Sequence, residues 1–233
     1  MADLTAIYHD KSASLGTKVM LACAHLLIVA VSAWLLLGGG ISVLDELFGR
    51  PHQLASTLRR SILAASAVLY FLRLLVTTFV FLKRRMSWFE VGMIAPWIAI
   101  IDVLFAYFGG RNDRPFGLMG IAGAALVLTG SILNTVSELQ RHLWKRRPEN
   151  AGHLYTSGLF RYSRHINYFG DEVLFTGWAL MTGRLGLLLI PIILAFGFIF
   201  TNIPVLDQYL EEKYGDEYHT YAQTVKRFIP YVY

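Results

Sequence analysis

Eight residues at positions 164–171, which read RHINYFGD, carry the densest group of chemically useful side chains in the sequence. They place two cations (Arg164 and His165), an amide (Asn167), a phenol (Tyr168) and a carboxylate (Asp171) around one glycine. The group lies where a basic, polar stretch meets an apolar one. A segment that only faces lipid or a protein core has no structural need for these groups. We therefore expect a site for a polar cofactor at a membrane surface.

A second polar group precedes it, with Asn134, Glu138, Arg141 and Lys145 in one stretch. Asn134 and Glu138 are four residues apart and share one face of a helix. Asn167 and Asp171 have the same spacing. Phosphates call for Arg and Lys, ribose hydroxyls for carboxylates, and a carboxamide or adenine edge for Asn. The two Asn–acid pairs flanking a basic loop favour a nucleotide site, although Glu138 and Arg141 could simply form a surface ion pair.

The familiar soluble cofactor motifs are missing from the sequence. The run Gly38-Gly39-Gly40 follows an apolar stretch rather than a strand, and it opens no βαβ unit. The sequence contains no phosphate-binding P-loop, and its histidines lack metal-ligand spacing. A nucleotide site would have to be built from helix ends and loops. We expect no metal site and no nucleic-acid partner.

The composition is that of an integral membrane protein. The chain is 55% hydrophobic and 16% charged, whereas soluble domains carry about 25% charged residues. Its apolar residues form runs close to the roughly 17–25 residues that a membrane helix needs. A soluble helical core is the alternative, and uncharged runs of this length argue against it. We predict an all-α protein with six transmembrane helices, at 19–40, 62–82, 88–108, 116–136, 168–182 (short) and 185–203.

The distribution of Lys and Arg predicts the orientation. With the N-terminus inside, fourteen of the 21 basic residues lie on the inner side. This places both termini, the loop 139–167 and the tail 205–233 in the cytoplasm. We expect the membrane to be a bacterial inner membrane or an equivalent one. Residues 1–16 show no signal peptide. We expect one membrane domain, with substrate-side helices at 1–110 and a cofactor-binding half at 111–233.

The segments outside the predicted spans have simple expected structures. The outer loop 39–59 carries a short amphipathic piece from Ile41 to Phe48. The tail predicts two short helices on the cytoplasmic face, Asp207 to Tyr214 and Asp216 to Val225, separated by Gly215 as a helix stop. We expect residues 228–231 to dock back onto the protein.

The polar groups and the tail together resemble a known superfamily. Segments 162–180 (YSRHINYFGDEVLFTGWAL) and 207–233 (DQYLEEKYGDEYHTYAQTVKRFIPYVY) resemble the C-terminal half of the membrane sterol reductases. Those enzymes carry an RHxNYxGD block and an IPYxY tail. The block also resembles the bacterial steroid-5α-reductase-like proteins (the DUF1295 group), with Ile166 where that group has Pro. Isoprenylcysteine carboxyl methyltransferases are relatives in the same superfamily.

Two further resemblances favour the reductase branch. Steroid 5α-reductases have an Asn-x3-Asp-x6-Arg pattern, whose spacing Asn134, Glu138 and Lys145 match. They also carry Tyr and Arg three apart with an Arg eleven residues later, as Tyr70, Arg73 and Arg84 are here. Arg73 lies inside an apolar segment and needs a partner or a phosphate. The alternative is a structural ion pair of Arg73 with Asp102 or Glu90.

The resemblance implies an NADPH-dependent reductase of a carbon–carbon double bond in a steroid, sterol or other lipid enone. It implies catalytic roles for Tyr70, as proton donor, and for Glu46. Asp45-Glu46 is the nearest candidate for the family's Gln-Glu pair, which otherwise has no counterpart. The implied cofactor-binding residues are Arg73, Arg84, Asn134, Glu138, Arg141, Lys145, Arg164, His165, Asn167, Tyr168, Asp171, Asp207 and Tyr209.

The sequence leaves two alternatives to a reductase open. The same pocket could hold S-adenosylmethionine in a methyltransferase of the isoprenylcysteine type, with His165 or Arg164 on the cofactor's carboxylate. That cofactor needs fewer cations than NADPH, and the basic residues of 141–164 favour the dinucleotide. The second alternative is a non-catalytic lipid-binding or scaffold protein.

Overall fold

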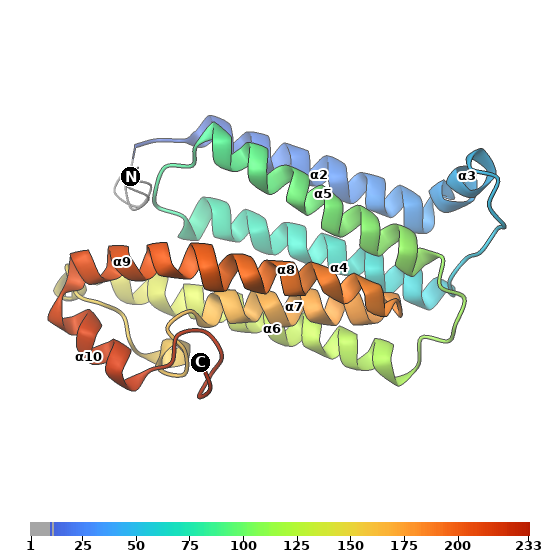
Figure 1. Cartoon of the computed structure of the whole chain (residues 1–233). Helices are drawn as coiled ribbons and strands as arrows, with labels where there is room; N and C mark the ends of the chain where they lie inside the picture. Colours follow the sequence, from blue (N-terminus) through green and yellow to red (C-terminus); the bar gives the residue numbers. More distant parts are fainter. Residues whose placement is uncertain (1–9, 11) are drawn as a thin grey trace.

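The computed structural model describes residue 10 and residues 12–233, and over these positions the chain is helical, with no strand. Residues 1–9 and Lys11, which carry part of the expected inner charge, lie outside the described residues. The all-α fold that the sequence predicts is confirmed. The helices run along one another as a bundle, with α10 and the C-terminus at one end and α3 at the other (Figure 1). Their bounds are α2 Leu15–Leu37, α3 Gly40–Leu47, α4 Thr57–Val76, α5 Trp88–Gly110, α6 Gly117–Lys145, α7 Ile166–Thr182, α8 Leu189–Gly197, α9 Ile203–Tyr214 and α10 Asp216–Thr224.

Five helical segments within the described residues are long and apolar enough to cross a membrane. Within their apolar stretches only 22–39% of the residues are buried, so most side chains face outward as lipid-facing ones would. Their bounds are Leu15–Leu37, Thr57–Phe81, Trp88–Gly110, Gly117–Lys145 and Leu185–Tyr214. The chain is therefore an integral membrane protein. Its orientation in the membrane stays a prediction.

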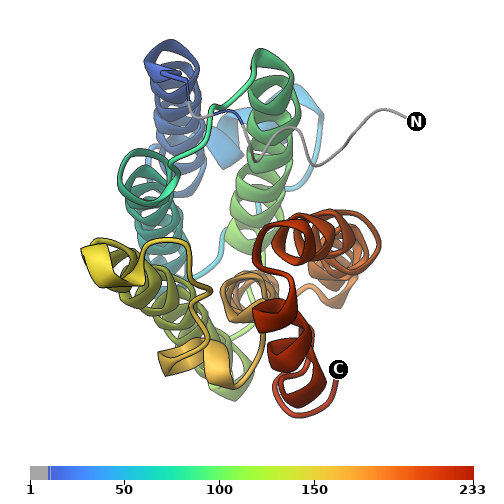
Figure 2. The ribbon, with the colours of Figure 1, turned by 90° about the vertical axis from the view of Figure 1, so that its left-hand side faces the viewer.

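The short fifth segment of the sequence prediction, 168–182, forms α7. It has 17 residues and is not among the five long apolar helices. Helix α7 lies inside the bundle, where it packs against α4, α5, α6 and α8 (Figure 2). Leu174, Trp178 and Met181 on this helix are almost completely buried. The short segment is thus a central helix of the core. Whether it crosses the membrane stays a prediction.

Helices α6 and α7 approach each other unusually closely through facing glycines. A Cβ atom added to Gly123 would lie 2.6 Å from the Gly177 carbonyl oxygen, and one added to Gly170 would lie 2.7 Å from the Asn134 amide nitrogen. Only glycine leaves room for this backbone contact, as in the small-residue interfaces of other membrane helices. The close approach brings the polar end of α6 against the start of α7.

The last long helix differs from the expected arrangement. Helix α8 continues through a π-helical turn, η5 (Phe198–Asn202), directly into α9. The expected first tail helix, from Asp207 to Tyr214, is therefore the end of a long helix, and only α10 is a separate short one (Figure 1). The prediction was wrong here because the polar residues of α9 suggested a new element, whereas helical hydrogen bonding continues past the apolar run. Phe228 in the tail docks back as expected, buried near Phe169 and Phe198.

Candidate functional site

The polar end of α6 and the start of α7 are joined by a chain of hydrogen bonds. The Asn134 side-chain amide donates to the Asn167 carbonyl oxygen (2.9 Å), and the Asn167 amide donates to Glu138 Oε1 (2.9 Å). Arg141 binds the other Glu138 oxygen at 2.5 Å. Asn134 and Glu138 are buried. Helix α6 thus extends nine residues past the predicted end of its apolar run at Val136 and places these groups against α7.

Arg73 on α4 forms an ion pair with Asp171 on α7, with 2.6 Å between Nη1 and Oδ1. Its partner is therefore neither Asp102 nor Glu90, the two candidates from the sequence. Both Arg73 and Asp171 are predicted cofactor residues, and the structure brings them together. The exposed fractions of their side chains are 7% and 19%. The pair links the substrate-side helices to the second half of the chain.

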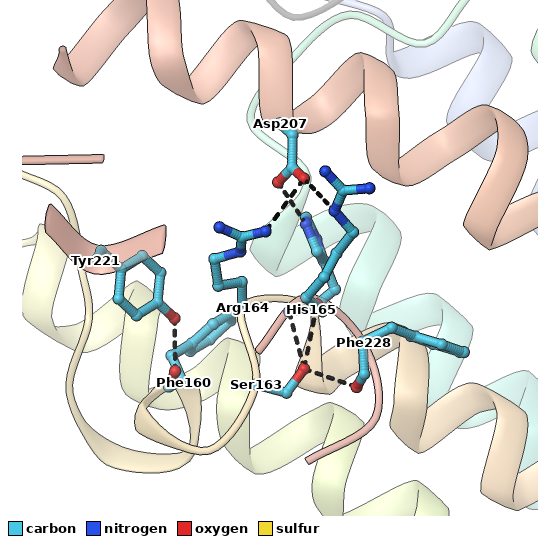
Figure 3. Close-up of polar contacts among 8 residues, drawn as sticks. Phe160, Ser163, Arg164, His165, Asp207, Tyr221 and Phe228 are labelled. Atoms are coloured by element: carbon cyan, nitrogen blue, oxygen red, sulfur yellow. Dashed lines mark hydrogen bonds and ion pairs between the residues drawn. The ribbon is translucent and has the colours of Figure 1, made fainter. Parts of the chain in front are cut away.

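Asp207 on α9 is the centre of a third polar group, shown in Figure 3. Its carboxylate lies 2.8 Å from His165 Nε2, 3.1 Å from Arg227 Nε and 3.6 Å from an Arg164 guanidinium nitrogen. Burial, and next to it the Asp207 carboxylate, raise the pKa of Tyr218 on α10. One carboxylate thus organises the loop before α7, the last long helix and the tail.

His165 is neutral at pH 7 in this arrangement. Burial lowers its pKa below the ordinary value of 6.5, and it outweighs the attraction of Asp207. Arg164 and Arg227 already compensate the Asp207 charge, so a third cation beside them is disfavoured. Neutral His165 keeps one N–H to donate and one nitrogen to accept.

The tail fixes the 163–165 segment through backbone groups. The Arg164 amide donates to the Lys226 carbonyl oxygen (2.9 Å), and the Ser163 hydroxyl donates to the Phe228 carbonyl oxygen (2.7 Å; Figure 3). The Tyr221 hydroxyl on α10 donates to the Phe160 carbonyl oxygen at 2.5 Å. Through these bonds the C-terminal residues contact and position the segment that carries Arg164 and His165.

A cleft of about 190 Å³ opens beside this network at the end of α6. Its walls are dominated by cationic and imidazole side chains, with a single carboxylate from the network. Such a surplus of cations suits a group with several negative charges. The lining residues are Phe81, Lys83, Glu138, Arg141, His142, Lys145 and Arg146.

Four more predicted cofactor residues, one of them the cleft residue Lys145, are each held by neighbouring side chains. Lys145 hydrogen-bonds the Tyr214 hydroxyl at 2.6 Å. Tyr168 stacks between His165 and Phe198, with ring centroids 5.7 Å and 4.7 Å away. Tyr209 accepts a hydrogen bond from its helix neighbour Lys213. Arg84 is held 2.5 Å from Glu90, next to the cleft residue Lys83.

The two predicted catalytic residues lie in different places. Tyr70 is buried in the bundle interior, with Phe175 and Trp178 of α7 around its ring, and the Arg73 guanidinium carbon lies 5.4 Å from the ring centroid. Glu46 is exposed on α3, at the end of the bundle opposite α10 (Figure 1). Its neighbour Asp45 is buried and binds Arg111 at 3.1 Å. The structure does not bring Glu46 to the site, because α3 caps the other end.

Several site residues were not selected from the sequence. Arg227 and Tyr218 reach Asp207 only because the tail folds back, and no local spacing signals that contact. The sequence treated Lys83 only as an orientation signal and Arg146 only as one of the basic residues of 141–164 that favour a dinucleotide, although both line the cleft. His142, one helical turn after Glu138, could have been found by its place on the polar end of α6.

Comparison with known proteins gives two kinds of relative. The chain is 28% identical over 155 residues to a Delta(14)-sterol reductase of Ascobolus immersus, covering 60% of the chain and 36% of that protein. It is 34% identical over 95 residues to the Delta(14)-sterol reductase erg24 of Schizosaccharomyces pombe, covering 40% of the chain and 22% of that protein. The chain thus spans about a third or less of these two reductases.

The second kind is a methyltransferase. The chain is 28% identical over 115 residues to protein-S-isoprenylcysteine O-methyltransferase B of Arabidopsis thaliana, covering 47% of the chain and 58% of that protein. Reductases and methyltransferases therefore share this sequence pattern.

A family model described as "protein of unknown function (DUF1295)" matches residues 54–225. This range begins just before α4 and includes the α6–α7 network, the cleft and Asp207. The match covers well over half of the sequence, and the chain belongs to the DUF1295 family.

Proposed function

We propose that this protein is an NADPH-dependent reductase that reduces a carbon–carbon double bond of a steroid, sterol or other lipid enone within the membrane. The observation that carries the proposal is the cationic cleft at the end of α6, which continues into the Glu138–Asn167–Asn134 network. Sequence similarity to sterol reductases supports the same reaction class.

The residues fit the parts of NADPH. Phosphate groups would bind Lys83, Arg141, Lys145 and Arg146 in the cleft. The cleft is smaller than the roughly 300–1,000 Å³ of pockets that enclose whole ligands, so it suits the phosphates alone. Glu138 and Asp171 would bind ribose hydroxyls. Asn134, whose buried side-chain oxygen has no hydrogen-bond partner among the described residues, would bind an amide group. The remaining proposed contacts come from Arg73, Arg84, Arg164, His165, Asn167, Tyr168, Asp207 and Tyr209.

The chain's own residues supply the proton. Bound NADPH would supply a hydride to the electron-poor carbon of the double bond, and a proton must then reach the substrate. Tyr70 is the proposed donor: its hydroxyl lies in the bundle interior, close to the Arg73–Asp171 pair that links it to the cofactor half. Arg73 would stabilise the negative charge that remains on the tyrosine oxygen. The buried aromatic walls around Tyr70 exclude water from this step.

The second candidate is an S-adenosylmethionine-dependent methyltransferase, and the similarity to an isoprenylcysteine methyltransferase favours it. Its cofactor carries one carboxylate and no phosphate. Four cations and a histidine around one cleft exceed what that group needs. The reductase explains this surplus, and the methyltransferase does not.

A charge-removal experiment separates the two candidates. Lys145→Gln and Arg146→Gln each remove a cleft cation, and Arg147→Gln removes the next cation along the chain, which does not line the cleft. We expect the cleft variants to bind NADPH about ten times more weakly, since a charged hydrogen bond contributes about 1.5–3 kcal/mol. NADPH binding by the Arg147 variant should be unchanged. Equal NADPH affinity in all three variants would contradict the proposal.

A further inference from the structure

Three side chains around Tyr70 have buried hydrogen-bonding atoms that lack a partner among the described residues. They are both ring nitrogens of His25, both carboxyl oxygens of Asp102 and the indole nitrogen of Trp178. Each of these residues is only 1% exposed. They come from α2, α5 and α7, three helices that pack around α4.

The three side chains surround Tyr70 rather than scatter through the bundle. The ring centroid of His25 lies 5.0 Å from that of Tyr70, and that of Trp178 lies 6.0 Å away. Asp102 lies on α5 one turn before Phe105, whose ring centroid is 5.4 Å from that of Trp178. Hydrogen-bonding groups from α2, α5 and α7 thus lie in the same buried part of the bundle.

Packing alone does not account for these groups. Most buried polar atoms in proteins have hydrogen-bond partners. Buried Thr17 follows this rule and donates to the Met86 carbonyl oxygen (2.8 Å), whereas the hydroxyls of Ser32 and Ser131 also have no partner among the described residues. A phenylalanine would fill the place of His25 without leaving ring nitrogens unpaired. Ionisable groups inside membrane segments usually serve a function.

His25 also lines a crevice between α2 and α4. The crevice measures about 10 Å³, which is roughly the space of one water molecule. Half-buried side chains line it, so it reaches the lipid-facing surface. Its other walls are Leu21, Ala22, Phe71, Leu74, Leu75 and Thr78.

We infer that His25, Asp102 and Trp178 form a recognition site around Tyr70 for an oxygen atom of a lipid ligand, a carbonyl or a hydroxyl, which enters between α2 and α4. His25 lines that path and would donate or accept a hydrogen bond at the oxygen. The inference deepens the proposed function, because it names the groups that orient the substrate at Tyr70. The binding site itself can be tested without NADPH.

The test compares two sterols that differ in one oxygen, cholest-4-en-3-one and cholest-4-ene, by equilibrium binding to the purified full chain. We expect the wild-type protein to prefer the ketone by about tenfold, the upper end of what one net hydrogen bond gives. His25→Phe keeps the ring and should abolish the preference while the affinity for cholest-4-ene stays. His25→Gln keeps a hydrogen-bonding group and should retain part of the preference.

Ser32→Ala is the matched control. Ser32 lies on the same helix two turns further on and is equally buried, and no described residue pairs with its hydroxyl. This variant should keep the full ketone preference. Absence of a preference in the wild-type protein, or an unchanged preference in His25→Phe, would overturn the inference. NADPH binding by the same samples reports separately on the proposed function, whose failure leaves the ketone preference standing.

Discussion

Tyr70 is the residue on which the proposed chemistry depends most directly. Replacing it with Phe removes the hydroxyl and leaves the ring contacts to Phe175 and Trp178. Loss of a general acid lowers turnover by about 10²–10⁴-fold. We expect kcat for NADPH-dependent enone reduction to fall in this range in Tyr70→Phe, while NADPH affinity, measured by titration, is unchanged. A variant with full turnover would remove Tyr70 from the mechanism.

His165 gives the folded protein a predictable dependence on pH. Because burial lowers its pKa in the folded state, the unfolded chain binds a proton there first as the pH falls below about 6.5. Stability from this residue is complete above that pH and is lost below it. We expect the melting-temperature advantage of wild type over His165→Gln to shrink between pH 7.5 and pH 5.5. An advantage that grows on acidification would mean that His165 is charged in the folded state.

At the scale of elements, the contact between α6 and α7 places the site. A Cβ at Gly130 would collide with the Gly170 carbonyl oxygen and the Leu174 backbone. Overpacking of this kind costs about 1–3 kcal/mol. We expect Gly130→Ala to lower the free energy of unfolding by this amount and to weaken NADPH binding, because Asn134 lies one turn away.

Gly197→Ala is the control for that prediction. Gly197 ends α8, and a Cβ there would meet no atom within 4 Å. Alanine is the better helix former, so we expect this variant to be neutral or slightly more stable in the same denaturation experiment. A Gly130→Ala protein as stable as Gly197→Ala would contradict this prediction, because it would show that α6 and α7 can move apart without lowering the free energy of unfolding.

At this scale the sequence predicts which residues share a helix face, because helical spacing is a local property. The four-residue spacing of Asn134 and Glu138 places both on one face, and the structure shows both facing α7. The partners of Asp207 and Arg73 were not predictable, since Arg227 and Asp171 reach them through contacts between distant parts of the fold. The length of the last helix was also missed, because polar residues at its end hid the continuation of its hydrogen bonds.

At the scale of the whole molecule, the charge distribution predicts which end of the bundle faces the cytoplasm. Arg146 directly follows α6 and Arg164 just precedes α7. These helix ends lie with α10 at one end of the bundle (Figure 1), and we expect that end to be inside. In a Cys23→Ser background, Glu149→Cys should react with a membrane-impermeant thiol reagent only after the membrane is opened. Asp113→Cys, in the loop at the α3 end, should react in intact cells. The reverse labelling pattern would invert the topology and expose the cleft to the outside.

The central claim is that the cleft at the end of α6 and its network bind NADPH. The most direct test is calorimetric titration of the detergent-purified protein with NADPH, NADH and S-adenosylmethionine in parallel. We expect binding of NADPH, weaker binding of NADH because it lacks the 2′-phosphate, and no binding of S-adenosylmethionine. Binding of S-adenosylmethionine alone would contradict the reductase and assign the same site to a methyltransferase.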